Sequence, residues 1–279
     1  LLIGGRAGEH VGFMLEFATF GTADTTSGDF SLFGSFKMPF TYQVRSINLA
    51  LIPFTTDAGG AAYGFELLNT GAQRFMRVGE DRSAMMAQQY LGLGAGEAGG
   101  FAFVAANDMG FINLSMWVPQ HGSFAVEALA PYLRVALTPR LGDWDTGIGV
   151  QYYSGKATVV DDTGADVDLA TEGWAVDGQA QGMIGTLPLG VYAAYGKVPT
   201  ETDNVFNSTG FDRTAWSVHG QLGVLPGRVT LLLGYRAADT GAATANEDNA
   251  VTVGGTYQFA QNVQLQLNHA LFSGSRYDT

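Results

Sequence analysis

The amino-acid sequence predicts an all-β fold, a transmembrane antiparallel β-barrel in which residues 1–279 form a single domain. Three observations lead to this prediction. Apolar and polar residues alternate over stretches of about ten residues, the length of a tilted strand that crosses a membrane. In the hairpin over residues 249–272 the polar face is small and uncharged, which suits a surface that lines water. Short and long connections follow one another in turn along the chain.

The hairpin over residues 249–272 shows the alternation most clearly. Val251 and Val253 share one face of its first strand, while threonines and glycines occupy the other face. After a short polar turn, Leu265 and Leu267 alternate with glutamines. Because side chains of a strand point alternately to opposite sides, one face of this hairpin is apolar and the other is polar.

Composition narrows the class of protein. Only 14% of the residues are charged, and the mean hydropathy is +0.09. No apolar run reaches the roughly eighteen residues of a membrane-spanning helix. The net charge of −12 argues against nucleic acid as a partner, because phosphates need Lys and Arg. The absence of cysteine excludes disulfides, thiolate metal sites and a Cys-x-x-Cys-His haem attachment motif in this chain.

The predicted strands of the first half are less regular than those of the second. A tight connection is expected at Pro39, and the alternation slips near Arg45 and Ser46, which predicts a β-bulge. The segments 83–93 and 100–106 are expected to form one hairpin. The predicted strands of this half cover residues 1–5, 11–18, 30–38, 42–53, 83–93, 100–106 and, with weak alternation, 111–117.

The second half reads as a regular series of hairpins. Short turns join the two strands of each hairpin, and longer polar loops join one hairpin to the next. The predicted strands cover residues 129–137, 144–153, 174–184, 189–197, 216–224, 229–237, 249–259 and 263–271. Outer-membrane barrels have short periplasmic turns and long external loops, so this asymmetry predicts the bacterial outer membrane as the location.

The number of strands bears on the completeness of the barrel. About fourteen strands are visible, and bacterial barrels have an even number, so we expect about sixteen in the complete protein. Leu1-Leu2-Ile3 reads as the middle of a strand, and Thr279 ends a loop. We therefore expect the first and last strands of the natural chain to be missing from this sequence.

Residues 54–82 are the least barrel-like segment, and two interpretations remain open. The segment is either an exposed loop, as most irregular sequence forms, or a loop folded into the lumen that narrows the pore. In the second case it is a constriction loop whose arginines face the water of the channel. These arginines are Arg74, Arg77 and Arg82.

Strand parity places charged and polar side chains on the lumen face. They either pair across the barrel and fill it or set the ion selectivity of a pore, and parity alone does not separate these roles. The candidate pore-lining residues are Glu16, Lys37, Arg45, Arg134, Asp177, His219 and Arg236. The acidic loops at 161–168, 201–203 and 247–248 are expected to be solvated surface, with cation bridging to lipopolysaccharide as the alternative.

No arrangement of residues indicates a catalytic or metal centre. The four histidines have no Cys, Asp or Glu at metal-ligand spacing, and no G-x-S-x-G motif occurs. A hydrolase built from His219 with Asp177 or Ser217 has no support in the spacing. We therefore expect no metal site, no cofactor in this chain and no enzyme activity.

The layout resembles that of bacterial outer-membrane porins over nearly the whole chain. Gly4-Gly5-Arg6-Ala7-Gly8-Glu9-His10-Val11-Gly12, leading into Phe13-Met14-Leu15-Glu16, is similar to the start of barrels in porin–cytochrome proteins. Ala105-Ala106-Asn107-Asp108-Met109-Gly110-Phe111 has a similar character. The resemblance implies a barrel that surrounds, or is fused to, a c-type cytochrome. The chain departs from that pattern because it has no haem attachment motif, which leaves haem to a missing segment or to a partner chain.

The function expected from these observations is a porin-like channel for passive diffusion of small hydrophilic solutes or ions. The alternative is the barrel sheath of an outer-membrane electron conduit that encloses, or is fused to, a c-type cytochrome. The expected partners are outer-membrane lipid and lipopolysaccharide, together with a c-type cytochrome in the alternative and further copies of the chain in a homo-oligomer. The sequence leaves open which solute passes and whether the lumen is open.

Overall fold

The computed structural model describes residues 1–23, 30–74, 86–122, 129–161 and 163–278. These residues form a 16-stranded sheet and a separate two-stranded ribbon, β11 (Lys156–Val160) with β12 (Asp166–Ala170). Two strands of the large sheet, β4 (Phe40–Val44) and β9 (Arg140–Leu141), lie off its main path. They pair with β5 (Ile47–Thr56) and β10 (Trp144–Tyr153), respectively. Fourteen strands remain on the path, which agrees with the number that the sequence predicts.

The main path follows the order of the chain, and every neighbouring pair is antiparallel. Its first half contains β1 (Leu2–Arg6), β2 (Gly12–Ala23), β3 (Phe30–Lys37), β5 (Ile47–Thr56), β6 (Ala98–Asn107), β7 (Gly110–Val118) and β8 (Ala130–Leu137). Its second half contains β10 (Trp144–Tyr153), β13 (Gly173–Ile184), β14 (Leu187–Val198), β15 (Arg213–Leu225), β16 (Val229–Asp239), β17 (Glu247–Ala260) and β18 (Val263–Ser273). The predicted antiparallel all-β fold is confirmed.

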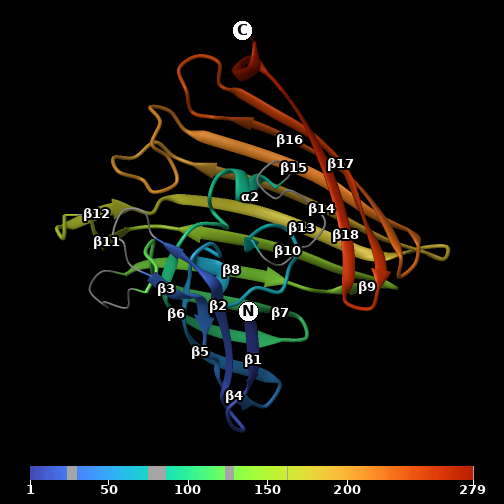
Figure 1. Cartoon of the computed structure of the whole chain (residues 1–279), viewed down its shortest axis with the longest axis horizontal. Coiled ribbons are helices and arrows are strands. Elements are labelled where there is room, and N and C mark those ends of the chain that lie inside the picture. The colour runs from blue at the N-terminus through green and yellow to red at the C-terminus, as the bar shows by residue number, and fades with distance from the viewer. Residues whose placement is uncertain (24–29, 75–85, 123–128, 162, 279) are drawn as a thin grey trace.

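The sheet curls around an interior, with β1 and β18 at its two edges (Figure 1). No ladder among the described residues joins these two strands. Two short helices, η1 (Ala61–Tyr63) and α2 (Ala87–Tyr90), belong to the connection between β5 and β6. A third, η4 (Ser275–Tyr277), follows β18. None of the described helices is long and apolar enough to cross a membrane.

Alternate residues of the strands face outward and are apolar. In β10 the burial alternates residue by residue, so that Ile148 and Val150 are exposed while Gln151 is buried. Aromatic pairs lie on the same outer face near the ends of the strands, such as Trp174 with Tyr195 at 5.5 Å between ring centroids. An outward belt of aliphatic residues bordered by aromatic rings suits a surface that faces lipid.

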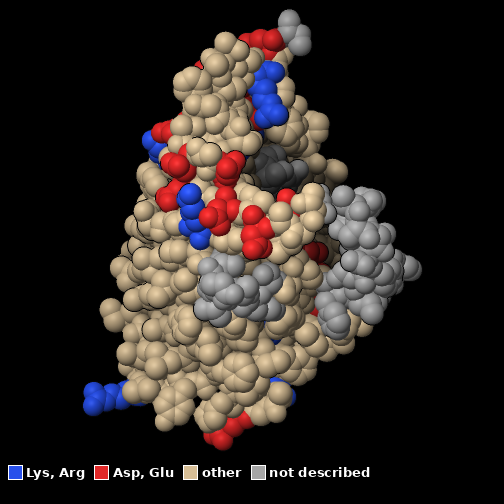
Figure 2. Space-filling model, turned by 90° about the vertical axis from the view of Figure 1, so that its left-hand side faces the viewer, with Lys and Arg blue, Asp and Glu red and all other residues tan. Residues whose placement is uncertain are grey.

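The predicted alternation of short and long connections is present. Turns of a few residues at 108–109, 185–186 and 261–262 alternate with long connections such as 199–212. The long connections gather at one end of the barrel, which faces the viewer in Figure 2. Asp and Glu side chains cluster on the upper part of this face, around a few Lys or Arg side chains.

Two predicted elements of the first half are wrong. Residues 42–53 do not form one strand with a bulge, because β4 and β5 are two strands joined by a turn in which Arg45 has a φ of 54°. The described part of the predicted strand 83–93 holds α2 and no strand, and β6 pairs with β5 and β7 instead. Residues 86–89 are buried in the interior, so their alternation does not report a lipid face and a lumen face.

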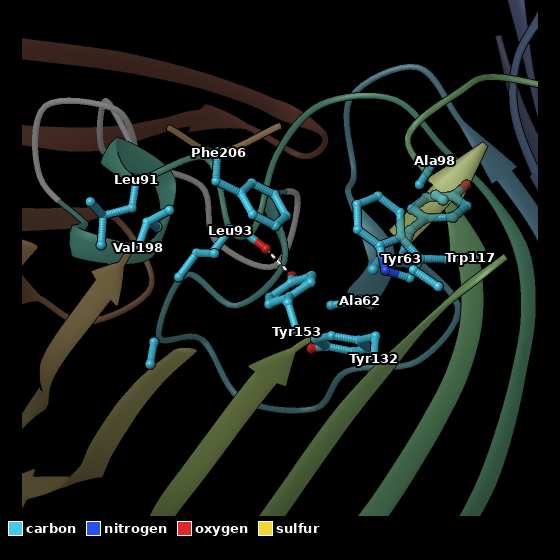
Figure 3. Packing of buried hydrophobic residues seen from close by; sticks show 14 of the residues in the cluster. Ala62, Tyr63, Leu91, Leu93, Ala98, Trp117, Tyr132, Tyr153, Val198 and Phe206 are labelled. Atoms are coloured by element: carbon cyan, nitrogen blue, oxygen red, sulfur yellow. Dashed lines mark hydrogen bonds between the residues drawn. The ribbon is translucent and has the colours of Figure 1, made fainter. Parts of the chain in front are cut away.

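The interior contains a packed apolar cluster beside its polar groups. Trp117, Tyr132 and Tyr153 point inward from β7, β8 and β10 (Figure 3). Trp117 and Tyr153 contact Phe206 from the loop 199–212, and Tyr132 packs on Tyr153. The Tyr153 hydroxyl donates a hydrogen bond to the carbonyl of Leu93, which follows α2 (Figure 3). Beside β7, β8 and β10 the interior of the barrel is therefore filled by other segments of the same chain.

Candidate functional site

The described residues of the connection between β5 and β6 lie mostly inside the barrel. They are residues 57–74 and 86–97, and most of them are buried against inward-facing side chains of the strands. We call these residues the inward segment. Of the two interpretations that the sequence leaves open, the structure agrees with the loop folded into the lumen. Arg74 is an exposed residue of this segment, whereas Arg77 and Arg82 lie outside the described residues.

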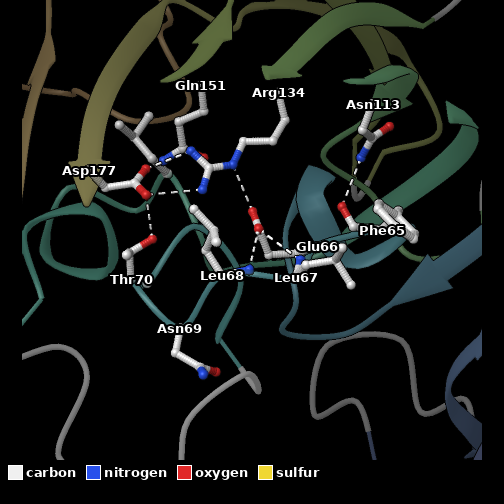
Figure 4. Close-up of polar contacts among 12 residues, drawn as sticks. Phe65, Glu66, Leu67, Leu68, Asn69, Thr70, Asn113, Arg134, Gln151 and Asp177 are labelled. Carbon is white, nitrogen blue, oxygen red and sulfur yellow. Dashed lines mark hydrogen bonds and ion pairs between the residues drawn. The ribbon is translucent and has the colours of Figure 1, made fainter. Parts of the chain in front are cut away.

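Arg134 of β8 binds the inward segment to the barrel wall. Its Nε donates to Oε2 of Glu66 at 2.8 Å, and its Nη1 donates to Oδ2 of Asp177 on β13 at 2.5 Å (Figure 4). All three side chains are almost completely buried. Since a buried charge is stable only when it is paired and hydrogen-bonded, these contacts depend on one another.

Further hydrogen bonds extend this network in both directions. Thr70 donates to Oδ1 of Asp177 at 2.6 Å, and the backbone amide of Asn69 donates to the Gln179 side chain at 2.7 Å. The Glu66 carboxylate also accepts from the amides of Leu67 and Leu68. Burial raises the pKa of the Glu66 carboxyl above its ordinary value, and the charge of Arg134 opposes that rise.

Two glycines of β10 leave room for this network. A Cβ atom at Gly149 would lie 2.4 Å from Nη1 of Arg134, and one at Gly147 would lie 2.6 Å from a methyl carbon of Leu68. Both positions are on the lumen face, where the sequence suggests a surface that lines water. Part of the glycine-rich lumen face instead accommodates the inward segment.

A second contact region lies near β2 and β3. Nζ of Lys37 donates to the carbonyl of Tyr63 at 3.1 Å and lies 4.8 Å from the centre of its ring. The carboxyl group of Glu16 lies near the Gly34 backbone, on the same side of the sheet. Lys37 and Glu16 thus face the interior, in agreement with their strand parity, and Lys37 holds η1.

A third network lies where α2 meets β16 and β17. The Arg236 guanidinium stacks on the ring of Tyr90 at 3.8 Å, and its Nη2 donates to Oδ1 of Asp248 at 2.9 Å. Asp248 also accepts from Tyr90, from Tyr277 and from Arg276. The prediction that residues 247–248 are solvated surface is wrong for Asp248, which is only 3% exposed because it is the common acceptor of this network.

The remaining candidate residues divide between the interior and a turn. His219 is buried on the lumen side of β15 and stacks on Tyr192, with 5.1 Å between the ring centroids. Arg45 is exposed in the turn between β4 and β5. The lumen assignment of Arg45 is therefore wrong, because a strand parity does not continue through a turn.

Several residues of these networks are absent from the sequence-based candidates. Glu66 and Thr70 lie in a segment without periodicity, and Tyr90 lies in a segment that resembles a strand. The only signal for Glu66 is a single acidic residue within the apolar stretch Phe65-Glu66-Leu67-Leu68. Such a residue needs a buried partner, and Arg134 supplies it.

Asp177 and Ser217, which a hydrolase around His219 would use, are bound within these networks. Among the described residues, no group of three or more His, Asp or Glu side chains could hold a metal ion. Asp177 is bound by Arg134 and Thr70, and Ser217 accepts a hydrogen bond from the amide of Ala87. These contacts give Asp177 and Ser217 structural roles in holding the inward segment.

The long loops carry several exposed acidic residues. Asp161 accepts hydrogen bonds from the hydroxyl and amide of Thr163 and from the amide of Ala165. These bonds, led by the one from the Thr163 side chain, lower the pKa of the Asp161 carboxyl. Asp161 therefore shapes the tip of the ribbon that β11 and β12 form.

The comparisons with known proteins concern the fold. No protein-family model and no curated protein sequence matches the chain. The solved structure of OmpT, an outer membrane protein of Vibrio cholerae in its trimer form, is similar with a TM-score of 0.56 and 15% identity, over 98% of this chain and 79% of that one. The outer membrane protein opdK from Pseudomonas aeruginosa has a TM-score of 0.53 and 13% identity, over 98% and 75%.

A further structure, described as a porin, has a TM-score of 0.51 and 15% identity, over 97% of this chain and 85% of that one. At these identities the similarity shows the fold. The antiparallel path, the apolar outer face and these neighbours agree with one another, and the chain has the fold of a porin-like outer-membrane β-barrel.

Proposed function

We propose that this chain is a bacterial outer-membrane channel for the passive diffusion of small hydrophilic solutes or ions. The observation that carries the proposal is the inward segment, which Arg134 ties to the wall inside a barrel of porin-like fold. A segment of this kind reduces the cross-section of the lumen and brings charged groups close to a passing solute. Passage then depends on the width and charge of the remaining space, without covalent chemistry.

The pore-lining role of the inward-facing charges is part of this proposal. Glu16, Lys37, Arg134, Asp177 and Arg236 lie on the lumen side, together with His219. Arg134 and Asp177 neutralise each other in a buried pair, so they act on solutes mainly by fixing the inward segment. Lys37 is less buried than Arg134 and Asp177, and it has no ion pair among the described residues. Lys37 is therefore a better candidate than these two residues for an effect on passing ions.

The proposed surroundings of the chain follow from its surface. The apolar outer belt fits outer-membrane lipid, and the long acidic loops would meet lipopolysaccharide. A homo-oligomer is also proposed, since OmpT of Vibrio cholerae is described in a trimer form.

The electron conduit remains the second candidate, on the resemblance to porin–cytochrome barrels alone. In that case the lumen would have to hold a cytochrome beside the inward segment, which already packs against β7, β8 and β10. No contact in the described part of the chain favours this candidate over the channel.

One sample tests both candidates. The protein is purified from native membranes, its absorption spectrum is recorded, and its conductance is measured in a planar lipid bilayer. Stable conductance without a haem band supports the channel. A silent protein with a Soret band contradicts the channel and supports the electron conduit, and a silent protein without haem contradicts both.

A further inference from the structure

A cavity of about 450 Å³ lies at the long-loop end of the barrel. The loops 199–212 and 240–246, the end of α2 and the residues after β18 contribute to it. Its polar lining consists of Tyr90, Ser208, Thr209, Arg213, Thr240 and Arg276. Two arginines and four hydroxyl groups thus line one space at the long-loop end, in a chain whose net charge is −12.

Arg213 brings to this cavity a positive charge that pairs with none of the described carboxylates. Its Nη1 donates to the carbonyl of Phe206, and its Nη2 donates to the carbonyl of Tyr90 at 3.1 Å. In the described part of the chain the ion pairs involve other arginines and lysines, and Arg213 forms none. Two carbonyl groups therefore fix the guanidinium in place without cancelling its charge.

Arg276 brings a second positive charge to the same cavity. Its Nη1 lies 2.6 Å from Oδ2 of Asp248, and its side chain is 54% exposed. Asp248 also pairs with Arg236, so one carboxylate is shared by two guanidiniums. The charges of Arg276 and Arg213 repel each other across the cavity, and an anion between them would relieve this repulsion.

Two other groups on the lining, the hydroxyls of Thr240 and Ser208, can donate hydrogen bonds to an anion, whereas those of Tyr90 and Thr209 already donate to protein acceptors. Thr240 Oγ1 accepts from the amide of Ala242 at 3.3 Å, which leaves its own hydrogen for a ligand. Ser208 adds another hydroxyl group. Planar guanidinium groups bind oxyanions through paired hydrogen bonds, and hydroxyl donors complete such a shell.

We propose that the cavity between Arg213 and Arg276 binds a small soluble oxyanion, the phosphate or carboxylate group of a solute. A neighbouring cavity of about 290 Å³ shares Tyr90 and Arg213 with it and reaches Trp117 in the interior. An anion bound at Arg213 thus lies on the boundary between the entrance and the interior. The proposal that this cavity binds an oxyanion does not depend on the channel. The use of the cavity as an entry site for solutes rests on the proposed function.

The test measures the binding of inorganic phosphate by isothermal titration calorimetry, with the full-length natively extracted protein in detergent at low ionic strength. The proposal predicts saturable binding, which the Arg276→Gln variant weakens by roughly tenfold, since one charged hydrogen-bonding group is lost. Arg140→Gln is the matched control. It removes an exposed arginine that pairs with Asp145 beside a short turn, away from the long loops.

Additional variants separate binding from folding. Arg213 also holds two loop carbonyl groups, so Arg213→Lys, which keeps the charge, is compared with Arg213→Gln, and both are checked by circular dichroism. If Arg213→Lys binds phosphate more strongly than Arg213→Gln does, the positive charge at position 213 acts on the ligand, as the proposal requires.

Three results would overturn the proposal. They are no uptake of phosphate by the wild type, equal losses in Arg276→Gln and Arg140→Gln, and binding that occurs only in micelles that contain lipid phosphate. The titration needs no ion flow, so a protein that binds phosphate but does not conduct would contradict the proposed channel and leave the binding site standing.

Discussion

At the scale of single residues, a few buried contacts decide how the inward segment lies. The guanidinium of Arg134 is completely buried, and it is stable there because Glu66 and Asp177 accept its hydrogen bonds. Removing one member of such a group leaves an uncompensated charge, which costs far more than an exposed ion pair contributes. The lumen charges of this barrel therefore have unequal roles, and those with the most partners fix structure.

Replacing Gly149 by alanine tests the space that the Arg134 guanidinium occupies. The new Cβ atom would lie 2.4 Å from Nη1, so the guanidinium must move away from its two carboxylates. We expect a loss of about 1–3 kcal/mol in the free energy of unfolding, as is typical for an overpacked interior. Urea unfolding of the protein in micelles or vesicles measures it.

The control for Gly149→Ala is Gly220→Ala on β15, where the nearest atom to the added Cβ is 3.6 Å away. This variant is expected to be as stable as the wild type. Equal stabilities of the two variants would show that the Arg134 guanidinium does not need the space beside Gly149.

Lys37 and Arg45 provide a matched pair for ion selectivity. Lys37 faces the interior beside Tyr63, whereas Arg45 is exposed in a turn. We expect Lys37→Gln to shift the reversal potential in a salt gradient toward a stronger preference for cations, because a positive charge leaves the lumen. Arg45→Gln is expected to have the reversal potential of the wild type. A larger effect from Arg45 than from Lys37 would contradict both assignments.

At the scale of elements, the regularity of a strand decides how well the sequence predicts it. In the strands of the main path from β10 through β13 to β18 one face meets lipid and the other faces the interior, so a period of two persists and the predicted strands agree with the observed ones. The ribbon of β11 and β12, in a region expected to be a loop, is not predicted. The segment 86–93 is buried within the barrel, and its apolar and polar residues then carry no parity signal. Its interior position depends on contacts with distant strands, which local sequence patterns do not report.

The same reasoning explains which residues of the candidate site could be predicted. Arg134, Asp177 and Arg236 follow from parity because they lie in long, regular strands. Glu66 and Tyr90 do not, since the inward segment has neither a period nor a motif. Glu66 is 68 residues before its partner Arg134, and Tyr90 is 146 residues before its partner Arg236.

The two faces of the last hairpin lead to a prediction for membrane insertion. Val253 points outward and is 51% exposed, whereas Gln266 has the opposite parity on β18. We expect Val253→Arg to destabilise the inserted barrel by ~2–4 kcal/mol, because the charge must enter the apolar layer. Gln266→Arg is expected to be tolerated. Folding into lipid vesicles at increasing urea concentrations measures both, and equal losses on the two faces would contradict the orientation of the sheet.

At the scale of the whole molecule, the barrel combines an apolar outside, charged networks inside and long acidic loops at one end. The inward segment connects these parts, because it binds β8 through Glu66 and meets β16 through Tyr90. In the proposed channel it narrows the lumen, so its attachment to the wall should control how much current the pore passes.

The most direct test of this account is the single-channel conductance of the wild type and of Glu66→Ala, measured side by side in a planar bilayer. Glu66→Ala removes the carboxylate that ties the inward segment to Arg134. The control is Glu9→Ala, which changes an exposed residue in the short turn between β1 and β2. We predict stable conductance in the wild type and in Glu9→Ala, and a larger or more variable conductance in Glu66→Ala. Correctly inserted wild-type protein that passes no current would contradict the channel, and identical conductance in all three would contradict the role of the inward segment.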